Sequence, residues 1–207
     1  MLGAVVLCAF TLVLRREIRS ARGAMAQERV MRALASRPGW ELEDRRRPTG
    51  GEVMLHFPWL AADRGTVVKG AVGAYPVTVV KLSKIDTRRG EHWLAVFYDL
   101  PDSHPSLSLQ RAWSVAHLRL HVPPDRYLPM SGDVEALSGR LTGTPLLERL
   151  TELGAPAVSL HERQACFLYY PLPRITDLEE LVTALADLLP TLTDLAGSSP
   201  SDGVPSS

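Results

Sequence analysis

Two histidines four residues apart, His117 and His121, form the most suggestive cluster of chemically active side chains in the sequence. On a helix this spacing could bring two imidazole rings to one zinc ion. The stretch HLRLHV alternates between polar and apolar residues, however, which predicts a strand with both histidines and Arg119 on one face. Because a cation between two histidines disfavours a metal ion, we interpret this face as solvent-exposed and expect no metal site.

Three further residues have side chains that could react. Cys166 follows His161 by five positions, but its neighbours are apolar, so we expect a buried thiol and not a thiolate nucleophile. The only other cysteine, Cys8, lies far away, which disfavours a disulfide within the domain. Asp99 and Asp102 could act as a pair of carboxylates, yet aspartates beside a proline are also ordinary turn residues.

Known motifs for phosphate binding and nucleophilic catalysis are missing. Lys69 precedes Gly70 and Gly73, whereas a phosphate loop places the lysine after its glycines and lies between a strand and a helix. Gly-x-Ser-x-Gly and Ser-x-x-Lys do not occur. The tryptophans show no alternation with basic residues, so nucleic acid is not an expected partner. The sequence therefore assigns no catalytic residue, no cofactor and no metal.

The composition is that of a folded protein with one domain and short appendages. The chain has 207 residues, of which 45% are apolar and 22% charged, and its formal net charge is zero. The charge is unevenly distributed, because residues 15–47 contain ten arginines and five acidic residues, a net of +5, whereas residues 48–207 carry a net of −5. This basic excess suits a segment at an anionic lipid surface, although a solvated charged helix has the same composition.

The basic segment directly follows an apolar start. Residues 2–14 contain no charge and in a helix would span about 20 Å, less than the hydrocarbon core of about 30 Å, unless a start codon further upstream lengthens the run. Because no basic residue precedes this run, an export signal is not expected. Four arginines follow it, which predicts by the positive-inside rule a membrane anchor with the rest of the chain in the cytoplasm. They are Arg15, Arg16, Arg19 and Arg22. The alternative is a buried element of a soluble protein.

The next part of the sequence predicts one helix and then several strands. Residues 15–36 have helical spacing, and the helix should end at SRPG because Pro38 disfavours helical backbone in the residue before it. Four later segments have strand composition: EVMLHF, TVVKGAV, YPVTVVKL and HWLAVFYDL. We expect the second and third to form a hairpin around GAVGA. The fourth is apolar on both faces, which predicts a central strand.

The segments after the fourth strand include a predicted connection, a region without an assignable element, a short helix and a hairpin. LPDSHPSLSL is expected to be a proline-bounded connection, and residues 123–143 contain no assignable element. Thr144 is expected to cap a short helix that ends at Gly154. The segment AVSLHERQACFLYYPL predicts a hairpin that turns near residues 162–164.

The C-terminal region predicts a longer helix and a tail. Thr176 and Glu179 form a capping box, and Pro190 is expected to kink or end the helix. Residues 197–207 have the composition of a disordered tail. Together these elements predict an α+β fold with a mainly antiparallel sheet, a short and a long C-terminal helix, and a preceding N-terminal membrane or juxtamembrane helix.

The order of these elements resembles a family of uncharacterised, membrane-anchored bacterial proteins. The matching segments are LASRPGW, GAVGAYPVTVVKL, LAVFYDLPDSHPSLSL, TPLLERL and TDLEELVTALADLLPTL. The family's Phe-Asn-containing segment before the first distal helix is missing. The resemblance implies a short anchor, an arginine cluster and an α+β domain. It brings no established activity and no catalytic residue.

These observations predict a single-pass protein of the cell membrane with a cytoplasmic domain that binds a protein or peptide partner and has no enzymatic activity. An alternative is an enzyme without a recognisable motif, for example a hydrolase that uses Asp99, Asp102 or the face between His117 and His121. A further alternative has the domain outside the cytoplasm. The expected segments are a membrane anchor at 1–14, a basic juxtamembrane helix at 15–38, the α+β domain at 39–196 and the disordered tail at 197–207.

Overall fold

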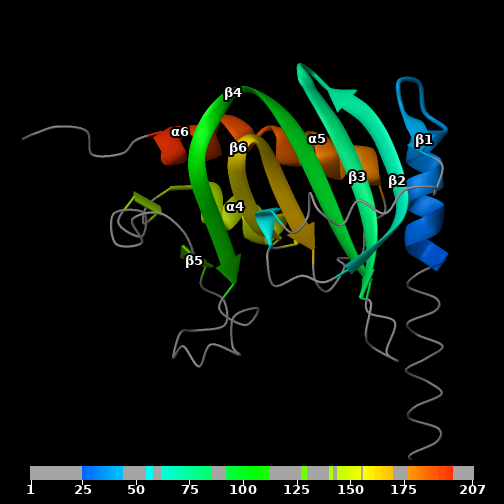
Figure 1. The fold of residues 1–207 in the computed structure, drawn as a ribbon, viewed down its shortest axis with the longest axis horizontal. Coiled ribbons are helices and arrows are strands. Elements are labelled where there is room, and N and C mark those ends of the chain that lie inside the picture. The colour runs from blue at the N-terminus through cyan, green and yellow to red at the C-terminus, as the bar shows by residue number, and fades with distance from the viewer. Residues whose placement is uncertain are drawn as a thin grey trace, which may run out of the picture.

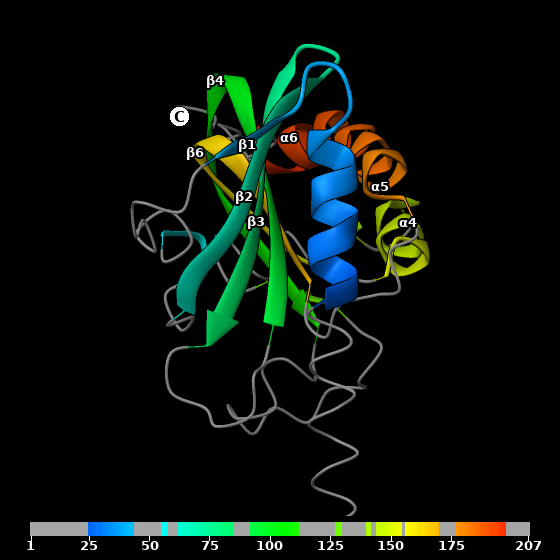
Figure 2. The same cartoon turned by 90° about the vertical axis from the view of Figure 1, so that its right-hand side faces the viewer.

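The protein folds into a six-stranded antiparallel sheet with its main helices on one face (Figures 1 and 2). The computed structural model describes residues 25–43, 55–57, 62–84, 92–111, 127–129, 140–141, 144–154, 156–169 and 177–197. A helix over residues 25–35 opens this part of the chain. The elements that follow are β1 (Glu41–Glu43), β2 (Ala62–Val72), β3 (Tyr75–Lys84), β4 (His92–Arg111), β5 (Tyr127–Pro129), α4 (Leu146–Glu152), β6 (Ala157–Tyr169), α5 (Leu178–Ala186) and α6 (Leu189–Gly197).

Every strand pair in the sheet is antiparallel. The strand order is β1-β2-β3-β4-β5, and β6 lies outside this path. It pairs with the edge of β4 opposite to β3, since residues 94–98 of β4 pair with both strands. The helix at residues 25–35, α4, α5 and α6 all cover the same face (Figure 2). The predicted α+β class with an antiparallel sheet is therefore confirmed. Strands that follow one another along the chain commonly pair with each other, as β1 to β5 do here.

The β2–β3 hairpin is the tightest connection. Val72 pairs with Tyr75, so only Gly73 and Ala74 lie between the two strands. Gly73 has a φ of 58°, and a glycine in this conformation at the first turn position is typical of a type II′ turn. The predicted hairpin around GAVGA is confirmed.

β4 is the central strand and separates two hydrophobic cores. Residues 93–98 are all at most 4% exposed, and alternate side chains point to opposite faces. The larger core lies beneath the helices, and the smaller core, which includes Phe57 and Cys166, lies on the opposite face. The two sets from β4 are Leu94, Val96 and Tyr98 on the helix side and Trp93, Ala95 and Phe97 on the other. The predicted central strand is confirmed.

β4 continues through the segment LPDSHPSLSL, so the predicted connection is wrong. Its register with β6 slips on both sides of His104. Pro101 and Pro105 lie within these two slips, where a strand tolerates a residue without an N–H group. The strand bends strongly at this point and forms the green arch in Figure 1. Proline therefore marks a bend within a strand here and not the end of the strand.

β6 follows the same bend as one strand of 13 residues, so the predicted hairpin near residues 162–164 is also wrong. Glu162 has a φ of 50° and pairs with His104. A left-handed residue occurs at a bulge as well as in a turn, and the local sequence does not distinguish the two. β4 pairs with β6 on both sides of its bend, so β6 continues as a strand where a turn is expected from the sequence.

The segment EVMLHF is not a regular strand in its described part. Leu55 and His56 form a helical turn, and Phe57 follows in irregular backbone. Phe57 is fully buried in the smaller core, whereas Leu55 is 63% exposed. The predicted strand is therefore wrong for these residues, because one apolar side chain can fill a core position without a regular element.

The short helix α4 is confirmed, but its cap is not. The Thr144 hydroxyl donates to the carbonyl oxygen of Leu141 at 3.0 Å, and α4 begins after Pro145 without a side-chain cap. The predicted Thr144 cap is therefore wrong. Gly154 has a φ of 89° just beyond the helix, as expected for a C-terminal glycine.

The long C-terminal helix is divided in two. Asp177 caps α5 and accepts hydrogen bonds from the backbone N–H groups of Glu179 and Glu180. The predicted cap at Thr176 is wrong, because Asp177 occupies the capping position. α5 ends at Ala186, and α6 begins just before Pro190, which confirms the predicted break. The buried stripe consists of Leu178, Val182, Leu185, Leu188 and Leu189.

The helix at residues 25–35 packs against the sheet. Met31 and Leu34 are at most 2% exposed in the larger core, and Gln27 Nε2 donates to the carbonyl oxygen of Trp93 at 3.3 Å. Turn backbone follows the helix and includes Gly39 with a φ of 82°. The predicted helix and its end at SRPG are confirmed for this part.

Several predicted segments lie outside the described residues. They are the anchor at 1–14, the start of the basic helix at 15–24, the strand HLRLHV and the tail beyond residue 197. Among the helices that the structure does describe, none combines the length and hydropathy needed to cross a bilayer.

Candidate functional site

A row of polar side chains, buried at one end and exposed at the other, lies on the sheet face opposite the helices. His56 Nδ1 is 3.1 Å from Ser159 Oγ, and His56 Nε2 is 3.0 Å from Gln164 Oε1. Gln164 Nε2 donates in turn to Asp99 Oδ1 at 3.1 Å. His56 and Ser159 are each 4% exposed, whereas Asp99 is exposed. These four residues, Ser159, His56, Gln164 and Asp99, are called the serine relay below.

The hydrogen-bond partners determine how the relay is protonated. A carboxylate only accepts, so Gln164 presents its amide nitrogen to Asp99 and its carbonyl oxygen to His56. That oxygen needs a donor, which assigns the histidine proton to Nε2. Nδ1 then has a free lone pair and accepts the hydrogen bond from the Ser159 hydroxyl. A serine hydroxyl bonded to an imidazole that is oriented from its other side is the arrangement of a nucleophile and its general base.

The bulge in β6 brings Ser159 and Gln164 to the same face of the sheet. Side chains alternate along a regular strand, so two residues five positions apart would point in opposite directions. The left-handed Glu162 shifts this alternation. Ser159 and Gln164 therefore both point away from the helices, as Cys166 does. Asp99 is the cross-strand partner of Gln164 and completes the relay.

Two buried oxygens beside the relay have no hydrogen-bond partner within the described part of the chain. Ser108 Oγ and Gln110 Oε1 lie on the same face of β4, and the two residues are 9% and 4% exposed. Ser108 is the direct cross-strand partner of Ser159, and Cβ atoms in such pairs are typically about 5 Å apart. A buried polar atom without a partner typically costs about 1–3 kcal/mol. Such atoms are rare in a protein core and are suited to binding a polar group.

A second serine–histidine pair lies at the outer edge of the relay. Ser106 Oγ is 3.1 Å from His161 Nδ1, and Ser106 is exposed. The ring of His161 meets the ring of His56 edge-on, with 6.2 Å between the ring centres. The Ser159–His56 pair therefore differs from the Ser106–His161 pair mainly in its burial and in the hydrogen bond that Gln164 makes to the second ring nitrogen of His56.

The pKa of His56 lies below its usual value. Burial is the main cause, because it disfavours the charged imidazolium, and the neighbouring His161 lowers the pKa further, while the hydrogen bond to Gln164 opposes both effects. His56 is therefore neutral at pH 7, and its Nδ1 lone pair is available to Ser159.

We expect this pKa shift to make the protein less stable in mild acid. Above pH about 6.5, the usual histidine value, His56 is neutral in both the folded and the unfolded chain. As the pH falls below this value only the unfolded chain takes up the proton, so the free energy of unfolding should decrease by up to about 1.4 kcal/mol per pH unit until the folded pKa is reached. Urea unfolding between pH 8 and pH 5 measures this slope.

The control for this prediction is the His56→Gln variant, which lacks the titrating group and should show a shallower slope. The carboxyls of Glu28 and Asp177, whose pKa values are lowered, are present in both proteins, so the difference between the two slopes reports His56. Equal slopes in the two proteins would contradict the prediction.

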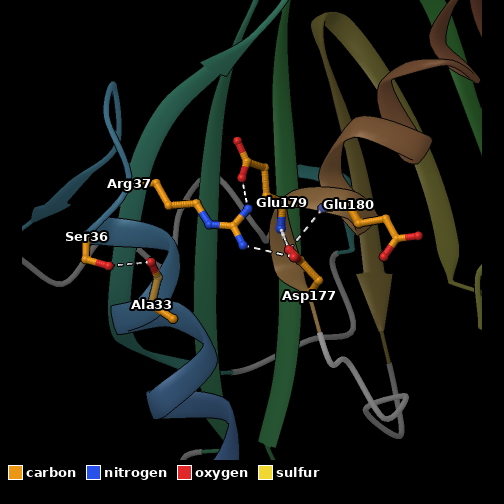
Figure 3. A network of polar contacts seen from close by, with 6 residues as sticks. All are labelled: Ala33, Ser36, Arg37, Asp177, Glu179 and Glu180. Carbon is orange, nitrogen blue, oxygen red and sulfur yellow. Dashed lines mark hydrogen bonds and ion pairs between the residues drawn. The ribbon is translucent and has the colours of Figure 1, made fainter.

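An ionic clamp on the other face joins the end of the helix at residues 25–35, called the N-terminal helix from here on, to the start of α5 (Figure 3). Arg37 Nη2 donates to Asp177 Oδ2 at 2.9 Å, and Arg37 Nη1 pairs with Glu179. The hydrogen bond from Arg37 lowers the pKa of the Asp177 carboxyl, and the backbone N–H of Glu180 adds to this effect. These residues, Arg37, Asp177 and Glu179, are called the Arg37 clamp.

A pocket of about 220 Å³ lies beside the clamp, between the N-terminal helix and α5. Its walls combine apolar side chains with charges of both signs. The lining residues, which together define the helix pocket, are Arg29, Val30, Ala33, Leu34, Arg37, Asp177, Leu178 and Glu179. The pocket is large enough for one amino-acid side chain.

We expect the clamp aspartate to stabilise the protein more as a helix cap than as an ionic partner. Asp177→Ala removes both functions, whereas Asp177→Asn keeps an oxygen that can accept the same backbone hydrogen bonds. Because Arg37 and Asp177 are 40% and 38% exposed, solvent weakens their ion pair. Thermal unfolding should give a Tm decrease for Asp177→Asn that is less than half of the decrease for Asp177→Ala. Equal decreases would show that the charge is the dominant contribution.

The structure does not gather the sequence-predicted candidates into one site. Asp99 joins the serine relay, while Asp102 lies exposed in the bend of β4. Cys166 is fully buried, and burial raises the pKa of its thiol, so the predicted core role is confirmed. His161 bonds to Ser106 and not to Cys166.

The hairpin interpretation of the glycine pair is also confirmed. Gly70 and Gly73 belong to the β2–β3 hairpin, and Lys69 Nζ lies 3.4 Å from the carboxylate of Glu43. His117 and His121 lie outside the described part, as do the membrane-flank arginines Arg15, Arg16, Arg19 and Arg22. Among the residues with a described position, no three His, Cys, Asp or Glu side chains are placed to hold a metal ion.

No protein-family model, curated protein or solved structure matches this chain. The resemblance to membrane-anchored bacterial proteins therefore remains a prediction. Function has to be inferred from the two sites that the fold itself presents.

Nothing in the local sequence points to the central pair of the relay. His56 and Ser159 are 103 positions apart, and His56 lies in a segment that was predicted as a strand. A nucleophile motif such as Gly-x-Ser-x-Gly describes a serine on a tight strand-to-helix turn, whereas Ser159 lies within β6. No local signal could have identified this pair.

Proposed function

We propose that the chain is a single-pass membrane protein whose α+β domain lies on the cytoplasmic side and binds a protein or peptide partner. Residues 1–14 would serve as the anchor. The flank of Arg15, Arg16, Arg19 and Arg22 would contact anionic lipid headgroups.

The proposed tethering is supported by the short link between the arginine flank and the folded domain. Arg22 precedes Met25 by only three residues, and the described part of the helix that packs on the sheet starts at Met25. Three residues span at most about 11 Å. A domain on so short a link would lie directly against the membrane surface, with the N-terminal end of this helix nearest to it.

The proposed partner site is the helix pocket. Val30, Ala33 and Leu178 provide apolar walls for one side chain of a bound peptide. Arg29 lies on the exposed side of the helix at the pocket rim, and within the described part of the chain no acidic side chain pairs with it. Charge complementarity therefore favours a peptide with an apolar residue next to an acidic one.

The membrane orientation can be tested with two reporters fused after Ser207. We expect a cytoplasmic fluorescent reporter to be active and an exported phosphatase to be inactive. Deletion of residues 1–14 should move the protein from the membrane fraction to the soluble fraction. An active phosphatase fusion would overturn the proposed orientation and support the alternative in which the domain lies outside the cytoplasm.

The partner site can be tested by photo-crosslinking in cells. A photoreactive residue at Ala33 should give one discrete adduct, whereas the same residue at the exposed Thr151 of α4 should give none. Arg29→Glu should abolish the adduct, and the matched variant Arg149→Glu on α4 should retain it. An adduct that survives Arg29→Glu would overturn the helix pocket as the docking site.

A second candidate function is an enzyme without a recognisable motif. The serine relay is the observation that favours it, because it combines a hydroxyl, a neutral imidazole and a group that orients the imidazole. Of the residues that the sequence suggested for a hydrolase, Asp99 belongs to this relay.

A further inference from the structure

We propose that Ser159 is a nucleophile activated by His56, and that the serine relay transfers acyl groups from small esters to water. This inference goes beyond the proposed binding role. The relay and the helix pocket lie on opposite faces of the sheet, so either proposal can fail without the other.

The contacts of each relay residue define its part in the reaction. Ser159 donates its hydrogen bond to His56 Nδ1 and is therefore positioned to lose its proton to that nitrogen. Gln164 accepts from Nε2–H and is a positioning residue that fixes the tautomer of His56. Asp99 fixes the orientation of the Gln164 amide. Ser159, His56 and Gln164 thus repeat the order of nucleophile, base and orienting group that serine hydrolases use.

Acyl transfer also requires a donor for the developing oxyanion, and Ser108 is placed to supply one. Its hydroxyl has no hydrogen-bond partner among the residues that the structure describes, and the residue is nine-tenths buried and lies directly across the ladder from Ser159. Two positions further along β4, Gln110 Oε1, which has no partner among the described residues, can accept a hydrogen bond. These atoms favour a short ester that carries a hydrogen-bond donor, such as a hydroxyl or an amide N–H.

A buried histidine network can also be purely structural, but two observations favour a reactive role here. The other half of the same sheet face is an apolar core that includes Val80, Phe97 and Leu168, so the face packs well without polar groups. The second observation is the place of Ser108 Oγ and Gln110 Oε1: within the described part of the chain both lack a partner, and both lie on the relay's face of the sheet, with Ser108 directly across from Ser159.

The reaction balances with water as the only co-reactant. Ser159 Oγ attacks the carbonyl carbon of the ester while its proton moves to His56 Nδ1. The carbon–oxygen bond to the alcohol then breaks, and His56 returns the proton to the leaving alcohol. Water next attacks the acyl-serine and gives its proton to His56 Nδ1. The bond between the acyl carbon and Ser159 Oγ then breaks, His56 returns the proton to Ser159 Oγ, and the products are the carboxylic acid and free Ser159.

The test uses the full chain in detergent and a fluorophosphonate probe, which forms an oxygen–phosphorus bond to an activated serine and releases fluoride. We expect one adduct, located at Ser159 by peptide mass spectrometry, and no such adduct in heat-unfolded protein. His56→Gln should lower the labelling rate by a factor of about 100 or more. The rate should rise with pH through the pKa of His56.

Two variants distinguish the relay from a structural network. Gln164→Glu puts a carboxylate beside Nε2, which should stabilise the imidazolium and move the midpoint of the pH profile upward. Ser106→Ala removes the serine of the neighbouring pair with His161 and should label at the wild-type rate.

Three results would overturn the proposal. They are an adduct at a residue other than Ser159, wild-type labelling no faster than that of unfolded protein, and undiminished labelling in folded His56→Gln. The first two are measured on the unmodified protein, so the test remains decisive even if a relay variant does not fold.

Discussion

Truncation of Phe167 to alanine should lower the free energy of unfolding by about 3–5 kcal/mol, the usual range for a fully buried phenylalanine. Phe167 is 0% exposed at the centre of the larger core, and its ring meets the ring of Tyr98 edge-on with 5.7 Å between the ring centres. It pairs with Val96 where β6 joins the central strand. The variant loses both the buried area and this aromatic contact.

Urea unfolding of Phe167→Ala should be compared with Leu42→Ala. Leu42 is 51% exposed on the edge strand β1, so its truncation should change the free energy of unfolding by less than about 0.5 kcal/mol. A loss below 1 kcal/mol for Phe167→Ala would contradict the full burial of Phe167 in the larger core.

Replacement of Gly70 with alanine should cost about 2–3 kcal/mol, because the site has no room for a methyl group. A Cβ atom at this position would meet the ring of Trp40 and would lie 3.0 Å from the carbonyl oxygen of Gly39. Trp40 is itself only 7% exposed and belongs to the larger core, so its ring cannot move into solvent without loss of packing. The glycine therefore allows the turn after the N-terminal helix to pack closely on β2.

A double-mutant cycle measured by urea unfolding tests this cause. Gly70→Ala should cost much less in a Trp40→Leu background, where the smaller side chain leaves space for the methyl group. Gly197→Ala is the matched control, because nothing lies within 4 Å of the added Cβ atom at the end of α6. An equal cost in both backgrounds would show that the clash with Trp40 is not the cause.

The two candidate sites depend on different parts of the fold. The helix pocket requires the N-terminal helix to remain docked on α5 through the Arg37 clamp. The serine relay requires the bends in β4 and β6, which align Ser159, Gln164 and Asp99. Phe167→Ala should impair both sites, whereas Ala33 and His56 variants should separate them.

The sequence alone determined the elements whose pattern is local. The hairpin at Gly73 follows from the glycine that a type II′ turn requires, and the double-sided apolar run at residues 93–98 identified the central strand. Pro38 and Pro190 marked the end of one helix and the division of another. Each of these features depends on the backbone preferences or side-chain alternation of a few neighbouring residues.

Only the tertiary structure decided how the strands continue and which polar side chains meet. Pro101 and Glu162 suit a turn as well as a bulge, and the choice depends on whether a partner strand is present beyond the bend. The contact between His56 and Ser159 joins residues 103 positions apart, so no periodicity in the sequence encodes it. The shift in side-chain alternation at Glu162 turns Gln164 toward His56, and that single change of phase forms the relay.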